Sequence, residues 1–142
     1  MMIHMIKKIQ QDRRVKKDLL AFLSEMETNL ENFYVMDQRQ FITHGYALCS
    51  WEAVKDLACI KKHESILVCM KTLEQFNALY KEHKEYEQWY TTDLKNKTPE
   101  NARKLHGMKH ELDKKLKLME SIIISAGQTL EKEMLDQGLL KA

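Results

Sequence analysis

The sequence predicts an all-α fold: an antiparallel, up-and-down bundle of long helices in a single domain spanning residues 1–142. Three observations favour it. The chain has only four Gly and one Pro, against about 17 expected from average usage, which leaves few turns. Charged residues make up 31% of the chain, as expected when long helices present one face to water. Apolar residues recur at intervals of three and four over long stretches, which is the helical period.

The clearest helical stretch begins at Thr98-Pro99-Glu100 and runs to about Gln137. Thr98 can cap this helix with its hydroxyl, and Pro99 suits the first helical position because an N–H there needs no partner. Gly138 is well placed to end the helix. About 38 residues at ~1.5 Å each give a helix near 57 Å long, which needs partner helices along its length. Its apolar stripe consists of Leu105, Leu112, Leu116, Met119, Ile123, Ala126 and Leu130.

The first predicted helix spans about residues 3–35, and its apolar content is diluted around Arg13 and Arg14. Its stripe consists of Ile6, Ile9, Leu19, Leu20, Leu23, Met26, Leu30 and Phe33. A second helix is predicted to open at the capping box Asp37-Gln38-Arg39-Gln40 and to continue to about Leu57. Gly45 weakens its first two turns, and Ser50, just before Trp51, is an alternative start.

A third helix is predicted over about residues 64–95, with no Gly or Pro separating it from the second. The apolar stripes of these two helices are about 100° out of phase at ~100° per residue, so we predict a break or strong kink at residues 61–65. The tight reversal at Asn96-Lys97-Thr98 should join the third and last helices into an antiparallel hairpin.

The order of charges bears on the number of helices. The first helix is basic early and acidic late, and the last helix repeats that order. In an up-and-down bundle of four helices these two run antiparallel, so that basic halves meet acidic halves. In a bundle of three they run parallel and form one positive pole. Exposed ion pairs contribute only about 0–1 kcal/mol each, so the charges favour four helices, with three as the alternative.

The composition limits which binding partners and which cellular compartment are expected. The formal net charge is +2, which gives no indication of nucleic-acid or membrane binding. No apolar run approaches the ~20 residues that cross a bilayer. Cys49, Cys59 and Cys69 are odd in number, and their spacing matches neither a disulfide framework nor a zinc site. We expect a cytoplasmic protein with small buried thiols and no cofactor.

The sharpest local pattern is an R-x4-H-x-Y string at Arg39, His44 and Tyr46. It resembles the signature of the HEPN superfamily, helical bundles that include RNA-cleaving toxins acting through a dimer cleft. The resemblance implies that Arg39 binds phosphate or stabilises the transition state and that His44 is the acid and base of metal-independent RNA cleavage. On one straight helix these two side chains point about 140° apart, so they would cooperate across a dimer or through distortion at Gly45.

A second pattern pairs His83-x-x-x-Glu87 with His106-x-x-x-His110. Each pair lies on one helix face, and a reversal near Lys97 would bring all four side chains into one layer. The spacings resemble the di-iron ligands of hemerythrin-type proteins, and this ligand set suits iron, zinc or manganese. His83 and Glu87 flank the apolar stripe of their helix. His106 and His110 lie about 115–155° from the centre of theirs and should face water or another subunit.

We therefore expect a non-enzymatic helical bundle that acts as a protein–protein interaction or assembly module, by self-association or with a helical partner. Long amphipathic helices, nine Met residues and the lack of a convergent polar site favour this function. A HEPN-like ribonuclease using Arg39 and His44 is the alternative hypothesis. A hemerythrin-like metal-binding bundle is the third. Neither nucleic acid nor a membrane is an expected partner of the assembly module.

Overall fold

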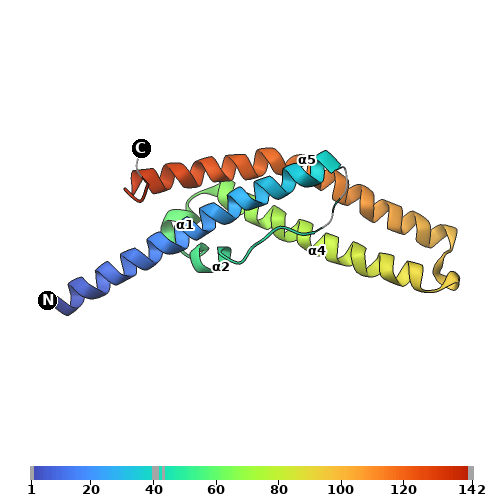
Figure 1. The fold of residues 1–142 in the computed structure, drawn as a ribbon, viewed down its shortest axis with the longest axis horizontal. Coiled ribbons are helices and arrows are strands. Elements are labelled where there is room, and N and C mark those ends of the chain that lie inside the picture. Colours follow the sequence, from blue (N-terminus) through green and yellow to red (C-terminus); the bar gives the residue numbers. More distant parts are fainter. Residues whose placement is uncertain (1, 40–41, 43, 141–142) are drawn as a thin grey trace.

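The structure, a computed structural model, describes residues 2–39, 42 and 44–140, with the backbone alone at His4 and Arg39. Three long helices dominate it: α1 (Met2–Arg39), α4 (Glu64–Thr92) and α5 (Pro99–Asp136) (Figure 1). Two short helices, α2 (Trp51–Val54) and α3 (Ala58–Lys61), lie between α1 and α4, and the 3-10 turn η1 (Leu94–Asn96) joins α4 to α5. The predicted all-α bundle is confirmed, with three long helices.

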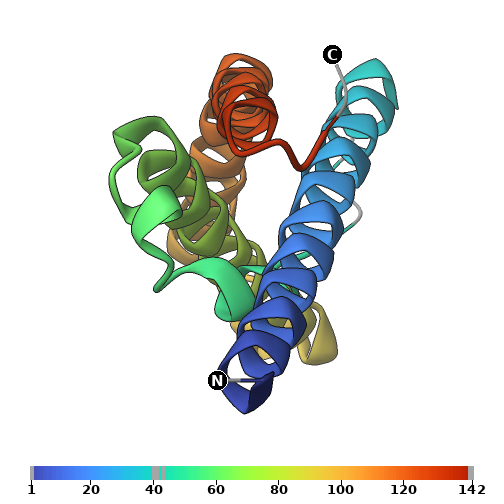
Figure 2. The same ribbon diagram turned by 90° about the vertical axis from the view of Figure 1, so that its left-hand side faces the viewer.

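The direction of each long helix follows from the connections. α4 and α5 form the predicted antiparallel hairpin, closed at η1 (Figure 1). α1 and α5 also run antiparallel: Tyr34 of α1 contacts Glu120 of α5, and residues 23–30 share a cavity with residues 123–131. α1 and α4 therefore run in the same direction, because the segment between them returns the chain to the other end. Seen along the hairpin, α1 crosses α4 and α5 obliquely (Figure 2).

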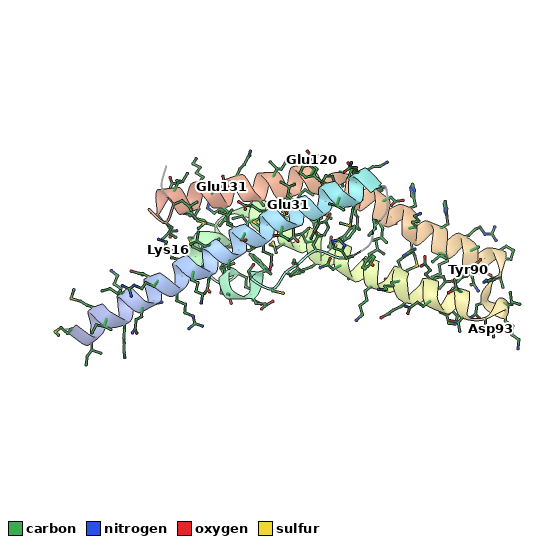
Figure 3. The ribbon with its side chains drawn as sticks, in the orientation of Figure 1. Lys16, Glu31, Tyr90, Asp93, Glu120 and Glu131 are labelled. Atoms are coloured by element: carbon green, nitrogen blue, oxygen red, sulfur yellow. The ribbon has the colours of Figure 1, made fainter. Side chains whose placement is uncertain are left out.

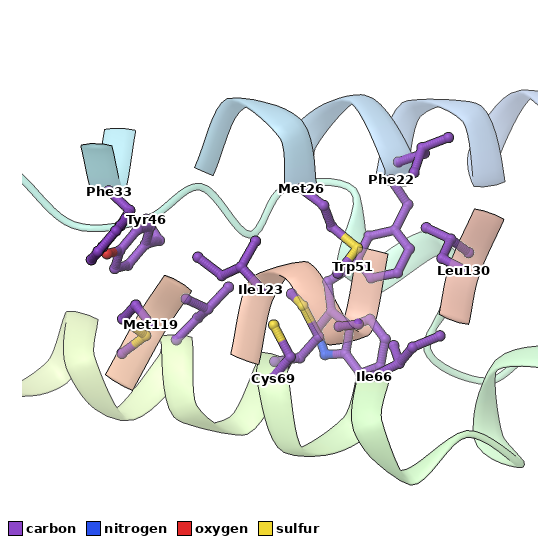
Figure 4. Packing of buried hydrophobic residues seen from close by; sticks show 14 of the residues in the cluster. Phe22, Met26, Phe33, Tyr46, Trp51, Ile66, Cys69, Met119, Ile123 and Leu130 are labelled. Atoms are coloured by element: carbon purple, nitrogen blue, oxygen red, sulfur yellow. The ribbon is translucent and has the colours of Figure 1, made fainter. Parts of the chain in front are cut away.

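The core lies where the three long helices overlap. Figure 4 shows side chains from α1, α2, α4 and α5 interleaved there, among them Phe22, Trp51, Cys69 and Ile123. The stripe predicted for α5 is buried except for Leu105, which is half-exposed. In α1 the prediction is confirmed for Leu19, Leu23, Met26 and Phe33. It is wrong for Ile6 and Ile9, which are exposed because α1 continues past its neighbours, and for Leu20, which lies off the buried face; Leu30 is half-buried.

The second predicted helix, from Asp37 to about Leu57, is wrong. Asp37 belongs to α1, and Phe41 of the predicted stripe lies outside the described residues. Residues 44–50 are not helical, and the helix that starts at Trp51, after the alternative start Ser50, has only 4 residues. The bundle thus has three long helices where charge favoured four. α1 and α5 run antiparallel in this topology too, but the basic part of α1 extends beyond the bundle, so the basic and acidic halves of these two helices do not meet.

Two asparagines explain how residues 44–50, which we call the irregular segment, can remain non-helical. The Tyr46 N–H donates to Asn77 Oδ1 at 2.7 Å, and Asn77 Nδ2 donates to the Tyr46 carbonyl at 2.8 Å. The Ala47 N–H donates to Asn29 Oδ1 at 2.9 Å, and Asn29 Nδ2 donates to the Ala47 carbonyl at 2.9 Å. Side chains from α4 and α1 thus satisfy backbone groups that a helix would otherwise pair internally. We call Asn29 and Asn77 the asparagine clamp.

Gly45 is needed for a steric reason beside this clamp. A Cβ added at Gly45 would lie 2.6 Å from Asn77 Oδ1, which is closer than real Cβ contacts allow. The segment then passes to α2 with two further supports. Glu25 Oε1 accepts the Ser50 N–H at 3.1 Å, and the rings of Phe22 and Trp51 lie 5.5 Å apart between centroids.

The predicted ends of α5 and the predicted break before α4 are confirmed. Thr98 Oγ1 accepts the Asn101 N–H at 3.1 Å, and Pro99 is the first residue of α5. Gly138 has a φ of 71°, and beyond it the Leu139 N–H donates to the Met134 carbonyl at 2.8 Å, which closes the end of α5. α3 ends at Lys61 and α4 begins at Glu64, so the predicted break is present.

Candidate functional site

The N-terminal part of α1 lies outside the bundle. Among residues 2–17, which we call the arm, Val15 is half-buried and every other described side chain is exposed. Figure 3 shows these side chains extending from a helix with no other helix beside it. Five large apolar side chains are between 47% and 75% exposed: Met2, Ile3, Met5, Ile6 and Ile9. Six cations, Lys7, Lys8, Arg13, Arg14, Lys16 and Lys17, accompany them, with Asp12 the acid among them.

The exposed apolar stripe of the arm is not an extension of the core face of α1. At about 100° per residue, Met2, Met5, Ile6 and Ile9 centre about 120° around the helix from the buried residues of α1. The core face itself runs out at Val15, beyond which its positions are occupied by Asp12, Gln11 and Lys8. The arm therefore carries an apolar surface of its own.

A groove lies between α4 and α5 at the opposite end of the molecule. One cavity of about 350 Å³ is lined by Ile42, Tyr80, His83, Lys84, Glu87, Lys109, Leu112 and Asp113. A second, of about 200 Å³, shares His83, Glu87 and Lys109 with it and adds Tyr90, Ala102, Leu105 and His106. We call the two together the hairpin groove.

The hairpin groove lies on the face of α4 that is buried in the core elsewhere, where Tyr46 of the irregular segment packs against Phe76. At about 100° per residue, Tyr80 and Glu87 lie on the same face of α4 as the buried Leu73 and Phe76. α1 ends at Arg39, before it reaches this part of the hairpin (Figure 1). Among the described residues, no third long helix covers this part of the face.

Three of the four residues of the predicted metal pattern meet in this groove. His83, Glu87 and His106 line the smaller cavity, whereas His110 does not line it. His106 and His110 are both exposed, as their helical phase predicted. In the part of the chain that the structure describes, no three His, Cys, Asp or Glu side chains converge closely enough to hold a metal ion.

The residues of the R-x4-H-x-Y pattern are spread over the end of α1 and the irregular segment. Arg39 is the last residue of α1, and its side chain lies outside the described residues. His44 is exposed. Tyr46 is buried, with its ring centroid 5.1 Å from that of Phe76, and burial raises the pKa of its hydroxyl well above the ordinary value. Tyr46 therefore has a packing role in the core.

A buried carboxylate, which sequence reasoning missed, joins α5 to the α3–α4 break. Glu133 is 5% exposed; its Oε1 lies 2.6 Å from Lys62 Nζ and 3.2 Å from His63 Nε2. The hydrogen bond from Lys62 lowers the pKa of Glu133, burial opposes this, and the hydrogen bond from His63 lowers the pKa further. In sequence Glu133 resembles an ordinary solvated position, because its partners lie 70 residues away.

No helix in the described parts of the chain is long and apolar enough to span a bilayer. Comparison with protein families, with curated proteins and with solved structures finds no match to this chain.

Proposed function

We propose that the chain is a non-enzymatic assembly module that binds a protein partner through the arm. The observation that supports this is the exposed apolar stripe at residues 2, 5, 6 and 9. These positions follow the i, i+3, i+4, i+7 spacing with which amphipathic helices enter apolar grooves of their partners. Burying an isoleucine side chain contributes about 1.5–3 kcal/mol, so covering this stripe is strongly favourable.

The stability of the arm supports the same proposal. Helices in proteins owe most of their stability to the packing of an apolar face against neighbouring elements. The arm makes little tertiary contact before Val15. A partner that packs on the stripe would hold the arm helical, and its carboxylates could pair with the cations on the same side as the stripe, such as Arg13 and Lys16.

The test is hydrogen exchange combined with light scattering on the full chain. Backbone amides of residues 2–17 should become protected as the chain concentration rises or as a partner is added, with a matching increase in mass. The double variant Ile6→Gln, Ile9→Gln should lose both effects, since it keeps helix propensity while removing apolar surface. The control Lys8→Gln alters charge on another face of the arm and should retain them.

The proposal is overturned if the arm exchanges rapidly under every condition and the double variant behaves as the wild-type chain. RNA cleavage that is lost in His44→Ala would instead support the HEPN-like ribonuclease. Stoichiometric metal that is lost in His83→Ala would support the metal-binding bundle.

A further inference from the structure

We propose that the partner of the arm is a second copy of this chain, and that each copy seats its arm in the hairpin groove of the other. This inference rests on the proposed function. It assigns a receiving surface as well as an inserted one, and it predicts a two-fold dimer.

The arm and the hairpin groove each lack a helical neighbour that the other could supply. The middle of the molecule packs three helices together, whereas the arm is one helix alone and the hairpin beyond Ile42 is two helices alone (Figures 1 and 3). One helix placed in the groove would restore the three-helix arrangement over the hairpin. The lengths also agree: residues 2–17 span about 24 Å, and residues 80–92 of α4 span about 20 Å, at ~1.5 Å per residue.

The chain cannot fill its own groove. The arm and the hairpin groove lie at opposite ends of the molecule, and the arm is continuous with α1, whose other half is fixed in the core (Figure 1). The groove must therefore receive the arm from another copy. Reciprocal exchange between two copies satisfies both arms and both grooves at once, which is the isologous arrangement of a closed dimer.

The area also favours reciprocal exchange. A helix about 24 Å long and ~10 Å across has a flat footprint of roughly 240 Å². A standard stable interface buries about 800 Å² of accessible surface per partner, which exceeds what one such footprint supplies. In a reciprocal dimer each copy both gives and receives an arm, so the footprint is doubled, and side-chain relief increases the accessible area above the flat one.

The chemistry of the two surfaces agrees as well. The groove offers half-buried apolar side chains to the stripe of the arm, namely Tyr80, Tyr90 and Leu105. Two carboxylates, Glu87 of α4 and Asp113 of α5, also line the groove, beside Lys84 and Lys109. These carboxylates can pair with cations on the stripe side of the arm, such as Arg13.

Two variants test the groove by light scattering and analytical ultracentrifugation over micromolar concentrations. Ala102→Arg puts a bulky cation into the groove from a half-buried position. It should raise the dimer dissociation constant about tenfold or more, as loss of a buried apolar contact does. Gly107→Arg is the matched control: it adds the same cation to the same helix at a site where an added Cβ meets nothing within 4 Å. It should leave the dimer unchanged.

Mixing the variants sharpens the test. Ile6→Gln, Ile9→Gln chains have intact grooves, and Ala102→Arg chains have intact arms, so a mixture should form mixed dimers that keep one of the two contacts. Their dissociation constant should lie between those of the wild-type dimer and of either variant alone. Circular dichroism on each variant establishes that it is folded.

The outcomes separate this inference from the proposed function. A protected arm with no effect of Ala102→Arg would place the arm elsewhere and overturn the inference, while the assembly function stands. A chain that is monomeric at every concentration, with an unprotected arm, would overturn both. Binding of the monomer to phosphatidylserine vesicles, lost in Ile6→Gln, Ile9→Gln, would also overturn both, since a lipid surface would then cover the stripe.

Discussion

The two connections between the long helices are built in different ways. The α4–α5 connection holds itself together: Asp93 Oδ1 accepts the Lys95 N–H at 3.0 Å, and Asn96 Nδ2 donates to the Trp89 carbonyl at 2.8 Å. The α1–α4 connection depends on distant side chains, since Asn29 and Asn77 lie 18 and 31 residues from the backbone groups they bind. The α4–α5 connection is determined by its own sequence. The α1–α4 connection forms only when α1 and α4 are in place.

This difference predicts that substitutions at the α1–α4 connection have the larger effects. Its supporting groups are buried or half-buried, so a deleted side chain leaves backbone groups without water or partner. At the α4–α5 connection the corresponding groups are exposed, and water can replace a lost bond.

The largest effect is expected for Asn29→Ala. Asn29 is 1% exposed, and its removal leaves the N–H and the carbonyl of Ala47 unsatisfied. Each such group costs about 1–3 kcal/mol, so the free energy of unfolding should fall by about 2–4 kcal/mol in urea titrations. Gln11→Ala removes an exposed amide from the same helix and should change it by less than about 0.5 kcal/mol. Equal effects of the two substitutions would contradict a clamp.

Gly45→Ala comes next, with an expected loss of about 1–3 kcal/mol, because the new methyl displaces Asn77 from its two bonds to Tyr46. The same substitution should be much less harmful in an Asn77→Ala background. A double-mutant cycle measures this coupling, which we expect at about 0.5–3 kcal/mol. Simple additivity would mean that Gly45 and Asn77 act independently.

A smaller effect on the free energy of unfolding is expected at the α4–α5 connection. Thr98→Ala removes the cap of α5 and should lower the free energy of unfolding by about 1 kcal/mol, whereas Thr98→Ser keeps a hydroxyl and should cost less. Urea titration of both variants decides this. A loss as large as that of Asn29→Ala would erase the distinction between the two connections.

The smallest effect is expected at Glu133 of α5, an ion-pair partner of Lys62 and His63 just before α4 that is separate from the asparagine clamp. Its pKa is lowered in the folded chain, so its contribution to stability is present above the ordinary value of 4.5 and is lost as the pH falls through the lowered value. The Lys62 side chain is 60% exposed, so water screens the pair. Wild type should exceed Glu133→Gln in urea midpoint at about pH 7, and the gap should narrow towards about pH 3. A constant gap would contradict ionic stabilisation.

Much of the fold was predictable because its signals are local. Thr98, Pro99 and Gly138 mark the ends of α5 within a few residues of themselves, and the phase slip near Lys62 marks the start of α4. The irregular segment was not predictable in this way. The predicted stripe around it has enough apolar residues for a helix, but at residues 44–50 a pair of amides from two other helices binds the backbone groups of Tyr46 and Ala47 instead.

The candidate surfaces were predictable only in part. The face of α4 that carries His83 and Glu87 was identified, and both residues line the hairpin groove. The arm was mistaken for core, because Ile6 and Ile9 have the spacing of buried residues and no sequence pattern reveals where neighbouring helices end. The offset of α1 along the hairpin determines which part of α1 is exposed and which part of the hairpin is left uncovered. This offset depends on the whole fold.

The asparagine clamp also has a consequence for the order of folding. A ribosome releases α1 long before α4, yet the segment that follows α1 acquires its partners only after Asn77 has been synthesised. The α4–α5 hairpin depends on contacts close in sequence and can form quickly once it emerges. We therefore expect the last helices made to pair first, with the first helix waiting to dock and bringing the irregular segment into place as it does so.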